Sequence, residues 1–171
     1  GTTASGAALR GLGTAAMMLH TPGKKLRLLS RIRLASLTAA GSQEIRVWGG
    51  VSIGTAATTA PATAIGFYWY YDKDNPNWVL RRRNSGAVND IDTGVAVEAG
   101  VWYDMELTVT GAAVDVDVTA ALSINGTHRA AHSQLVSPML YNPVSAAIQK
   151  AVGTTARLLY LDYEALFVER A

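Results

Sequence analysis

The sequence contains no cysteine and few charged residues. The absence of cysteine from 171 residues excludes a disulfide framework, a thiolate metal site and a cysteine nucleophile. Lys and Arg total 15 against 13 for Asp and Glu, and this net charge of +2 is too small to indicate a nucleic-acid partner. Because only 16% of residues are charged while 49% are hydrophobic, we expect apolar surface to be buried in a homo-oligomer.

Long hydrophobic runs are also absent. The most apolar stretch, residues 158–168, is interrupted by Asp162 and Glu164 and is shorter than the roughly 20 residues of a membrane-spanning helix, so we expect no membrane insertion. Residues 1–13 are rich in Gly, Ala and Thr and lack the pattern of a secretion signal. We expect them to form a flexible linker after an upstream segment, and residues 14–171 to form a single domain.

Alternating polar and apolar residues predict β-strands along the chain. The alternation is clear at residues 26–34, 44–48 and 101–110, and residues 65–71 form the most aromatic run. Asn125-Gly126 predicts a type I′ hairpin turn, because both central positions of that turn need positive φ. Short strands separated by turns are typical of a sandwich or a barrel.

One segment predicts a short helix near residues 143–152. Asn142 and Pro143 suit the cap and the first helical position, and Gly153 suits the end. The apolar residues between them follow helical spacing: Val144, Ala147, Ile148 and Ala151.

Three motifs in the second half of the chain resemble concanavalin A-like and laminin G-like domains. They are Ala99-Gly100-Val101-Trp102-Tyr103-Asp104-Met105, Leu122-Ser123-Ile124-Asn125-Gly126-Thr127 and Leu159-Tyr160-Leu161-Asp162-Tyr163. The resemblance covers residues 95–170 and implies an all-β, two-sheet antiparallel jelly-roll sandwich.

Three further segments, residues 66–78, 92–94 and 153–157, resemble domains of this fold in bacteriophage tail fibres and tailspikes. This resemblance implies a homotrimeric, non-enzymatic virion module, extracellular when it acts, that binds or is presented to host-surface carbohydrate. One alternative is a structural trimerisation or capsid-decoration domain without a ligand. The other is a polysaccharide depolymerase that uses Asp115 and Asp117 as paired carboxylates, although Ala120 stands where the acidic motif of such enzymes has a third carboxylate.

Aromatic and basic side chains between residues 48 and 83 form the candidate carbohydrate site. Flat rings stack on sugars, and guanidinium groups bind anionic sugars. The alternative is that individual rings fill the core or a subunit interface and that the arginines protect an edge strand. The candidates are Trp48, Tyr68, Tyr70, Trp78, Arg81 and Arg83.

The polar segment 72–77 is a candidate calcium site. Asp72, Asp74, Asn75 and Asn77 offer oxygen atoms of the kind that Ca²⁺ prefers. The same residue types build an ordinary solvated turn, which is the interpretation we favour. We expect no other cofactor.

Overall fold

The computed structural model describes residues 7–11, 17–18, 22–37, 44–53, 65–84, 87–113, 116–134, 140–150 and 158–169. These residues form twelve β-strands and no helix. The strands are β1 (Ala7–Gly11), β2 (Met17–Met18), β3 (Lys25–Leu34), β4 (Ile45–Ile53), β5 (Gly66–Tyr71), β6 (Asn77–Asn84), β7 (Ala87–Ala96), β8 (Trp102–Thr110), β9 (Val118–Ile124), β10 (Thr127–Gln134), β11 (Leu140–Lys150) and β12 (Leu159–Glu169).

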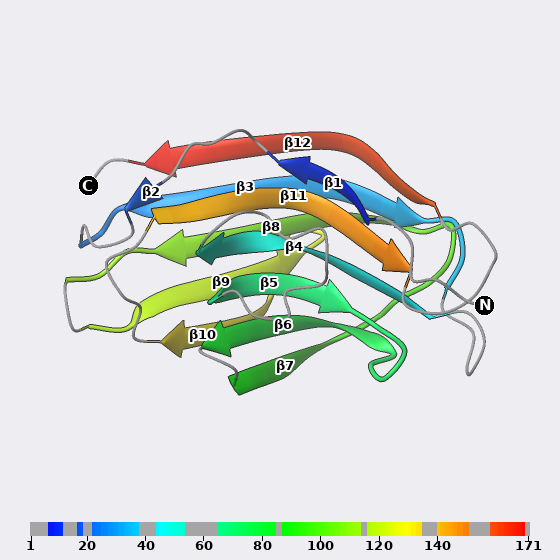
Figure 1. The fold of residues 1–171 in the computed structure, drawn as a ribbon, viewed down its shortest axis with the longest axis horizontal. Coiled ribbons are helices and arrows are strands. Elements are labelled where there is room, and N and C mark those ends of the chain that lie inside the picture. Colours follow the sequence, from blue (N-terminus) through cyan, green and yellow to red (C-terminus); the bar gives the residue numbers. More distant parts are fainter. Residues whose placement is uncertain are drawn as a thin grey trace.

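The strands form two antiparallel sheets that lie one over the other (Figure 1). The seven-stranded sheet has the order β1-β11-β4-β5-β6-β7, with β2 also paired to β11, and the five-stranded sheet has the order β10-β9-β8-β3-β12. The expected all-β, two-sheet jelly-roll sandwich is therefore confirmed. No helix among the described residues is long and apolar enough to cross a membrane.

The core between the sheets is centred on an aromatic cluster. Trp78 makes edge-on contacts with Trp69, Tyr71 and Tyr103, at ring centroid distances of 5.6, 5.8 and 5.4 Å. The Tyr103 hydroxyl accepts a hydrogen bond from the backbone N–H of Glu98 and donates one to the Ala96 carbonyl. Tyr103 of the five-stranded sheet thus packs against Trp78 and also anchors the connection between β7 and β8.

The Asn125-Gly126 turn joins β9 to β10 as the sequence predicts. Asn125 and Gly126 have φ values of 53° and 74°, which are the positive values that a type I′ turn requires. The Asn125 side-chain oxygen also accepts a hydrogen bond of 2.9 Å from the backbone N–H of Asp104. The turn is therefore held against β8.

The predicted helix at residues 143–152 is wrong, because residues 140–150 form β11, which pairs with β1 and β4. A bulge in β11 explains the misleading spacing. Val144 is paired with Gly50 and Ala147 with Trp48, so three residues of β11 span two residues of β4. Two outward-facing residues are thereby separated by three positions, which imitates the helical period.

The first strand occupies part of the expected linker. Residues 7–11 form β1, which pairs with β11 in the seven-stranded sheet.

A second bulge, between Leu161 and Tyr163, changes which residues of β12 face the core. Leu159 and Leu161 pack against the core, whereas Tyr163 and Phe167 are 44% and 48% exposed.

Replacing Trp78 tests the importance of the central cluster. Trp78→Ala removes a fully buried ring with three aromatic neighbours and should reduce the free energy of unfolding by about 3–5 kcal/mol. Val88→Ala, at a position that is 46% exposed, is the control and should change it by less than about 0.5 kcal/mol. Urea denaturation of both variants measures the difference. A similar loss in the two variants would show that the cluster is not the centre of the core.

Candidate functional site

The register of β4, β5 and β6 brings five of the six candidate carbohydrate residues to one face. Trp48 is paired with Tyr70, and Tyr68 with Arg81. Arg83 lies two positions beyond Arg81 and so shares its face. This is the outer face of the seven-stranded sheet, because the alternate residues of these strands belong to the core.

The sixth candidate, Trp78, lies in the core between the sheets and is 0% exposed, so it cannot contact a ligand on the outer face. The rings on the outer face are also covered. Trp48, Tyr68 and Tyr70 are 2%, 1% and 2% exposed. A sugar therefore cannot stack on these rings while the face stays in this arrangement.

Arg81 is fixed by two neighbours. Its guanidinium carbon lies 3.5 Å from the centre of the Tyr70 ring, and it makes a forked pair with the Asp90 carboxylate through bonds of 2.8 and 2.6 Å. The Tyr70 hydroxyl donates a 3.0 Å hydrogen bond to Asp72. Arg81 thus has its charge neutralised, and its role is to hold this row of side chains in place.

Tyr68 and Arg83 lie on the same face as Arg81 but in a different environment. The Tyr68 hydroxyl interacts with Ser52 and lies in the field of the Arg83 guanidinium. No carboxylate among the described residues pairs with Arg83, and its Nε atom is shielded from solvent without a hydrogen bond. A side chain at Gly66 would lie 2.8 Å from the Tyr68 hydroxyl, so the glycine leaves room for that group. A phenol beside an unneutralised cation is suited to proton transfer near a bound anion.

Burial controls the protonation of both tyrosines. It raises the pKa of Tyr68 well above the ordinary value, against the opposing effects of Ser52 and Arg83. Burial also raises the pKa of Tyr70 to about 12, while the charge of Arg81 lowers it and that of Asp72 raises it. Both phenols are therefore neutral at physiological pH.

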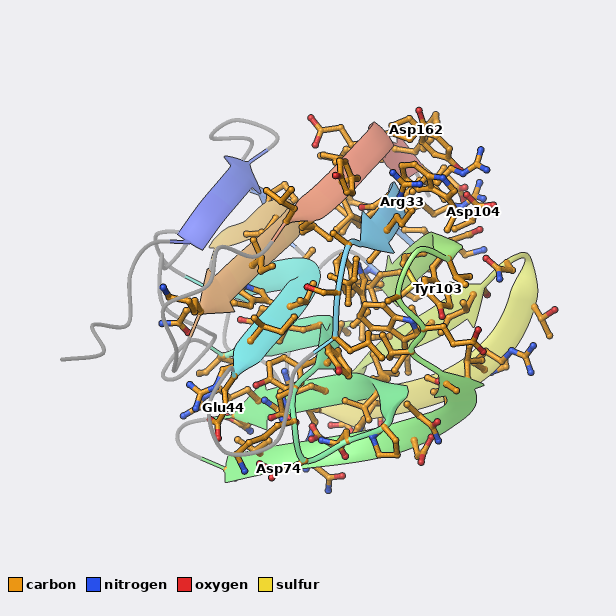
Figure 2. All side chains as sticks on the ribbon, turned by 90° about the vertical axis from the view of Figure 1, so that its right-hand side faces the viewer. Arg33, Glu44, Asp74, Tyr103, Asp104 and Asp162 are labelled. Atoms are coloured by element: carbon orange, nitrogen blue, oxygen red, sulfur yellow. The ribbon has the colours of Figure 1, made fainter. Side chains whose placement is uncertain are left out.

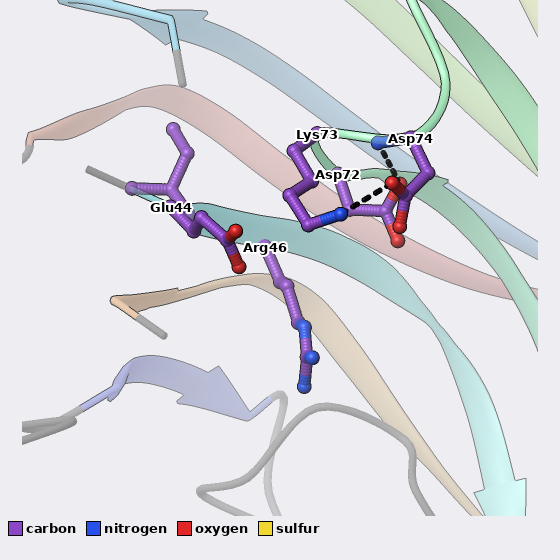
Figure 3. A pocket seen from close by; sticks show the side chains of 6 residues that line it. Glu44, Arg46, Asp72, Lys73 and Asp74 are labelled. Carbon is purple, nitrogen blue, oxygen red and sulfur yellow. Dashed lines mark hydrogen bonds and ion pairs between the residues drawn. The ribbon is translucent and has the colours of Figure 1, made fainter. Parts of the chain in front are cut away.

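The calcium candidates lie at the turn between β5 and β6, beside a small pocket. Figure 3 shows this pocket, which is lined by Glu44 and Arg46 from the start of β4 and by Asp72, Lys73 and Asp74 from the turn. The Lys73 ammonium group pairs with Asp74, and the backbone N–H of Asp74 donates to Asp72. The lining therefore carries charges of both signs.

Polar groups of the calcium candidates form hydrogen bonds with one another and with Asp92. Asp72 also accepts a hydrogen bond from the side-chain amide of Asn75, and the amide of Asn77 donates to Asp92 instead of turning towards the loop. Within the described ranges, no three acidic or histidine side chains gather in a way that could hold a metal ion. This geometry is that of a hydrogen-bonded turn, and calcium binding stays a prediction.

Two polar residues of the outer face were not predicted from the sequence. Ser52 is in phase with Trp48 on β4, and Asp90 lies opposite Arg81 on β7. Strand alternation along β4 could have predicted that Ser52 shares the face of Trp48. The position of Asp90 opposite Arg81 depends on the register between β6 and β7, which the sequence does not give. Of the proposed depolymerase pair, Asp117 is exposed and Asp115 lies outside the described residues.

Comparison with solved structures places the chain among concanavalin A-like sandwiches. The alginate lyase AlyC3 superimposes with a TM-score of 0.63 at 12% identity, over 91% of this chain and 68% of that chain. An endo-1,3-beta-glucanase from Streptomyces sioyaensis gives 0.58 at 9% identity, over 90% and 67%. The carbohydrate recognition domain of Emp47p gives 0.57 at 11% identity, over 98% and 87%. No protein-family model and no curated protein matches the chain.

These structures correct the functional expectation. A non-enzymatic virion module was expected, but the solved structures that share the fold include several alginate lyases and a glucanase, and they give no support for a phage fibre. The expectation that the chain is not an enzyme is overturned by the same finding. The sequence motifs behind it identify the sandwich, which enzymes and binding domains share.

The raised pKa of Tyr70 predicts a pH-dependent stability. The unfolded chain has the ordinary tyrosine pKa of 10.0, so the buried neutral phenol stabilises the fold below pH 10, and this contribution is lost as the pH rises towards about 12. The free energy of unfolding should fall over this interval, and less steeply in Tyr70→Phe than in the wild type. Tyr160→Phe, at a 40% exposed position, is the control. Equal slopes in all three proteins would contradict the assignment.

Proposed function

We propose that this chain is a polysaccharide lyase that cleaves an acidic, uronate-containing polysaccharide at the outer face of the seven-stranded sheet. The position of Tyr68 on the same face as Ser52 and Arg83, which flank Gly66 across the strands, is the observation that carries the proposal. The fold shared with alginate lyases supports it, because the same sandwich holds that chemistry in proteins of similar architecture.

The reaction is a β-elimination. A base removes the proton on the carbon next to the uronate carboxylate, and the electron pair forms a carbon–carbon double bond. The bond between the neighbouring ring carbon and the glycosidic oxygen breaks, and that oxygen takes up a proton. The products are a new reducing end and an unsaturated uronate, so no water is consumed.

Arg83 has the charge that this reaction requires. Its guanidinium binds the substrate carboxylate and neutralises the negative charge that develops there when the neighbouring proton leaves. Arg81 cannot take this role equally well, because Asp90 already neutralises it. The two outward-facing arginines of β6 therefore have separate functions: Arg83 binds substrate and Arg81 holds Tyr70 in position.

Tyr68 is the residue that transfers the proton. As the phenolate it accepts the proton from carbon, and as the phenol it returns that proton to the glycosidic oxygen. Because burial raises its pKa, the phenolate is a minor form at neutral pH, and the reaction should accelerate as the pH rises. Tyr68 is 1% exposed, so substrate binding has to uncover its hydroxyl.

Ultraviolet absorbance of the unsaturated product tests this proposal on a panel of polyuronates. The wild type should generate the absorbance on at least one of them, and Tyr68→Phe should reduce kcat by at least about a hundredfold, the usual effect of losing a proton-transfer group. Arg83→Gln should raise KM as well as lower kcat. Tyr163→Phe, on the opposite sheet, is the matched control and should keep the wild-type rate.

Two outcomes would contradict the assignment. Failure of the wild type to cleave every polyuronate would remove the proposed activity. Unchanged turnover in Tyr68→Phe, with the protein folded as judged by circular dichroism, would leave the activity in place but assign it to other residues.

A further inference from the structure

The outer face of the five-stranded sheet carries a second group of aromatic and basic side chains. Trp102 on β8 is paired with Arg33 on β3, and Arg33 is paired with Tyr160 on β12, so the three residues form one row across three strands. The guanidinium carbon of Arg33 lies 4.9 Å from the centre of the Trp102 ring and 4.6 Å from the centre of the Tyr160 ring. A cation is thus held by two rings.

The other outward-facing arginines of β3 have carboxylate partners. Arg27 pairs with Glu106 at 2.9 Å and with Glu169 at 3.8 Å. Arg31 lies 3.6 Å from both Asp104 and Asp162.

Arg33 is different. It has no carboxylate partner among the described residues, and its Nε atom, like that of Arg31, is shielded from solvent without a hydrogen bond. The row formed by Trp102, Arg33 and Tyr160 therefore carries an unneutralised positive charge.

One side of this row is exposed to solvent, and a hydrogen bond orders the side chains on its other side. Tyr160 is 40% exposed, so one aromatic surface remains available. Next to it, the Tyr163 hydroxyl donates a 3.2 Å hydrogen bond to Asp104. Figure 2 shows Arg33, Asp104 and Asp162 gathered in one region, well apart from Glu44 and Asp74 beside the pocket.

We propose that Trp102, Arg33 and Tyr160 form a second carbohydrate site that binds a carboxylate-bearing sugar. The guanidinium of Arg33 pairs with the sugar carboxylate, and an exposed ring packs against the apolar face of the sugar. The choice of a uronate rests on the proposed lyase function, but the site is separate from Tyr68 and Arg83, which lie on the other sheet. It holds a polysaccharide chain without cleaving it.

Tryptophan fluorescence provides a direct test, because the four tryptophans differ in exposure. Trp48, Trp69 and Trp78 are 2%, 0% and 0% exposed, whereas Trp102 is partly exposed, so acrylamide quenching reports mainly on Trp102. In a Tyr68→Phe background, which slows turnover by at least about a hundredfold, oligouronates prepared from alginate should protect the fluorescence from acrylamide. Neutral gluco-oligosaccharides should not protect it.

Two arginine variants in the same background identify the residue responsible. Arg33→Gln should weaken the oligouronate affinity by roughly tenfold or more, the usual effect of losing a charge-assisted hydrogen bond. Arg27→Gln, on the same face of the same strand but paired with Glu106, should leave the affinity within about twofold. Thermal melting confirms that both variants fold. If Arg33→Gln does not fold, Tyr160→Ala takes its place in the comparison.

Three results would overturn this inference, whether or not the lyase proposal is correct. Protection of Trp102 by oligouronates could be absent. The Arg33 and Arg27 variants could lose affinity equally, which would indicate general attraction between charges. A polyglutamate peptide could protect Trp102 as well as the oligouronates do, which would assign the site to an acidic protein partner. If Arg33-dependent sugar binding persists while no polyuronate is cleaved, the second site stands and only the lyase proposal fails.

Discussion

The two-sided burial of β5 is the constraint on which the rest of the structure depends. Phe67, Trp69 and Tyr71 face the inter-sheet core, while Tyr68 and Tyr70 face outwards and are still 1–2% exposed. A shift of one residue in the register of β5 would exchange the two sets, remove Trp69 from Trp78 and separate Tyr70 from Arg81. The same pairing that stabilises the core therefore positions the candidate site.

Charge neutralisation distinguishes the arginines that hold the structure from those available to a ligand. Arg81, Arg31 and Arg27 each face a carboxylate across a strand pair. Arg83 and Arg33 do not, although each is held near an aromatic ring or phenol within the described part of the chain. Among the described arginines without a carboxylate partner, which also include Arg46, Arg82 and Arg129, Arg83 and Arg33 lie beside aromatic side chains, and this combination indicates where an anionic ligand is best accommodated.

Much of the fold could be predicted from the sequence, because alternation and turn chemistry are local. The strand at residues 101–110 and the Asn125-Gly126 turn occur as expected. The bulge in β11 could not be foreseen, since it depends on pairing with β4, and it made a strand resemble a helix. For the site, strand periodicity is enough to place Tyr68 and Tyr70 on one face, but the orientation of Trp78 and the partner of Arg81 required the register of β6 and β7. Function was misjudged because motifs of the sandwich are shared by proteins with different chemistry.

The outer face of the seven-stranded sheet is proposed to carry out an elimination. The mass of the oligosaccharides released from a polyuronate measures this directly, because elimination and hydrolysis differ by one water in the product. We predict products that are one water lighter than hydrolysed oligosaccharides, with an unsaturated residue at one end. Products with the mass of hydrolysed chains, or an intact polymer after prolonged incubation, would contradict the claim.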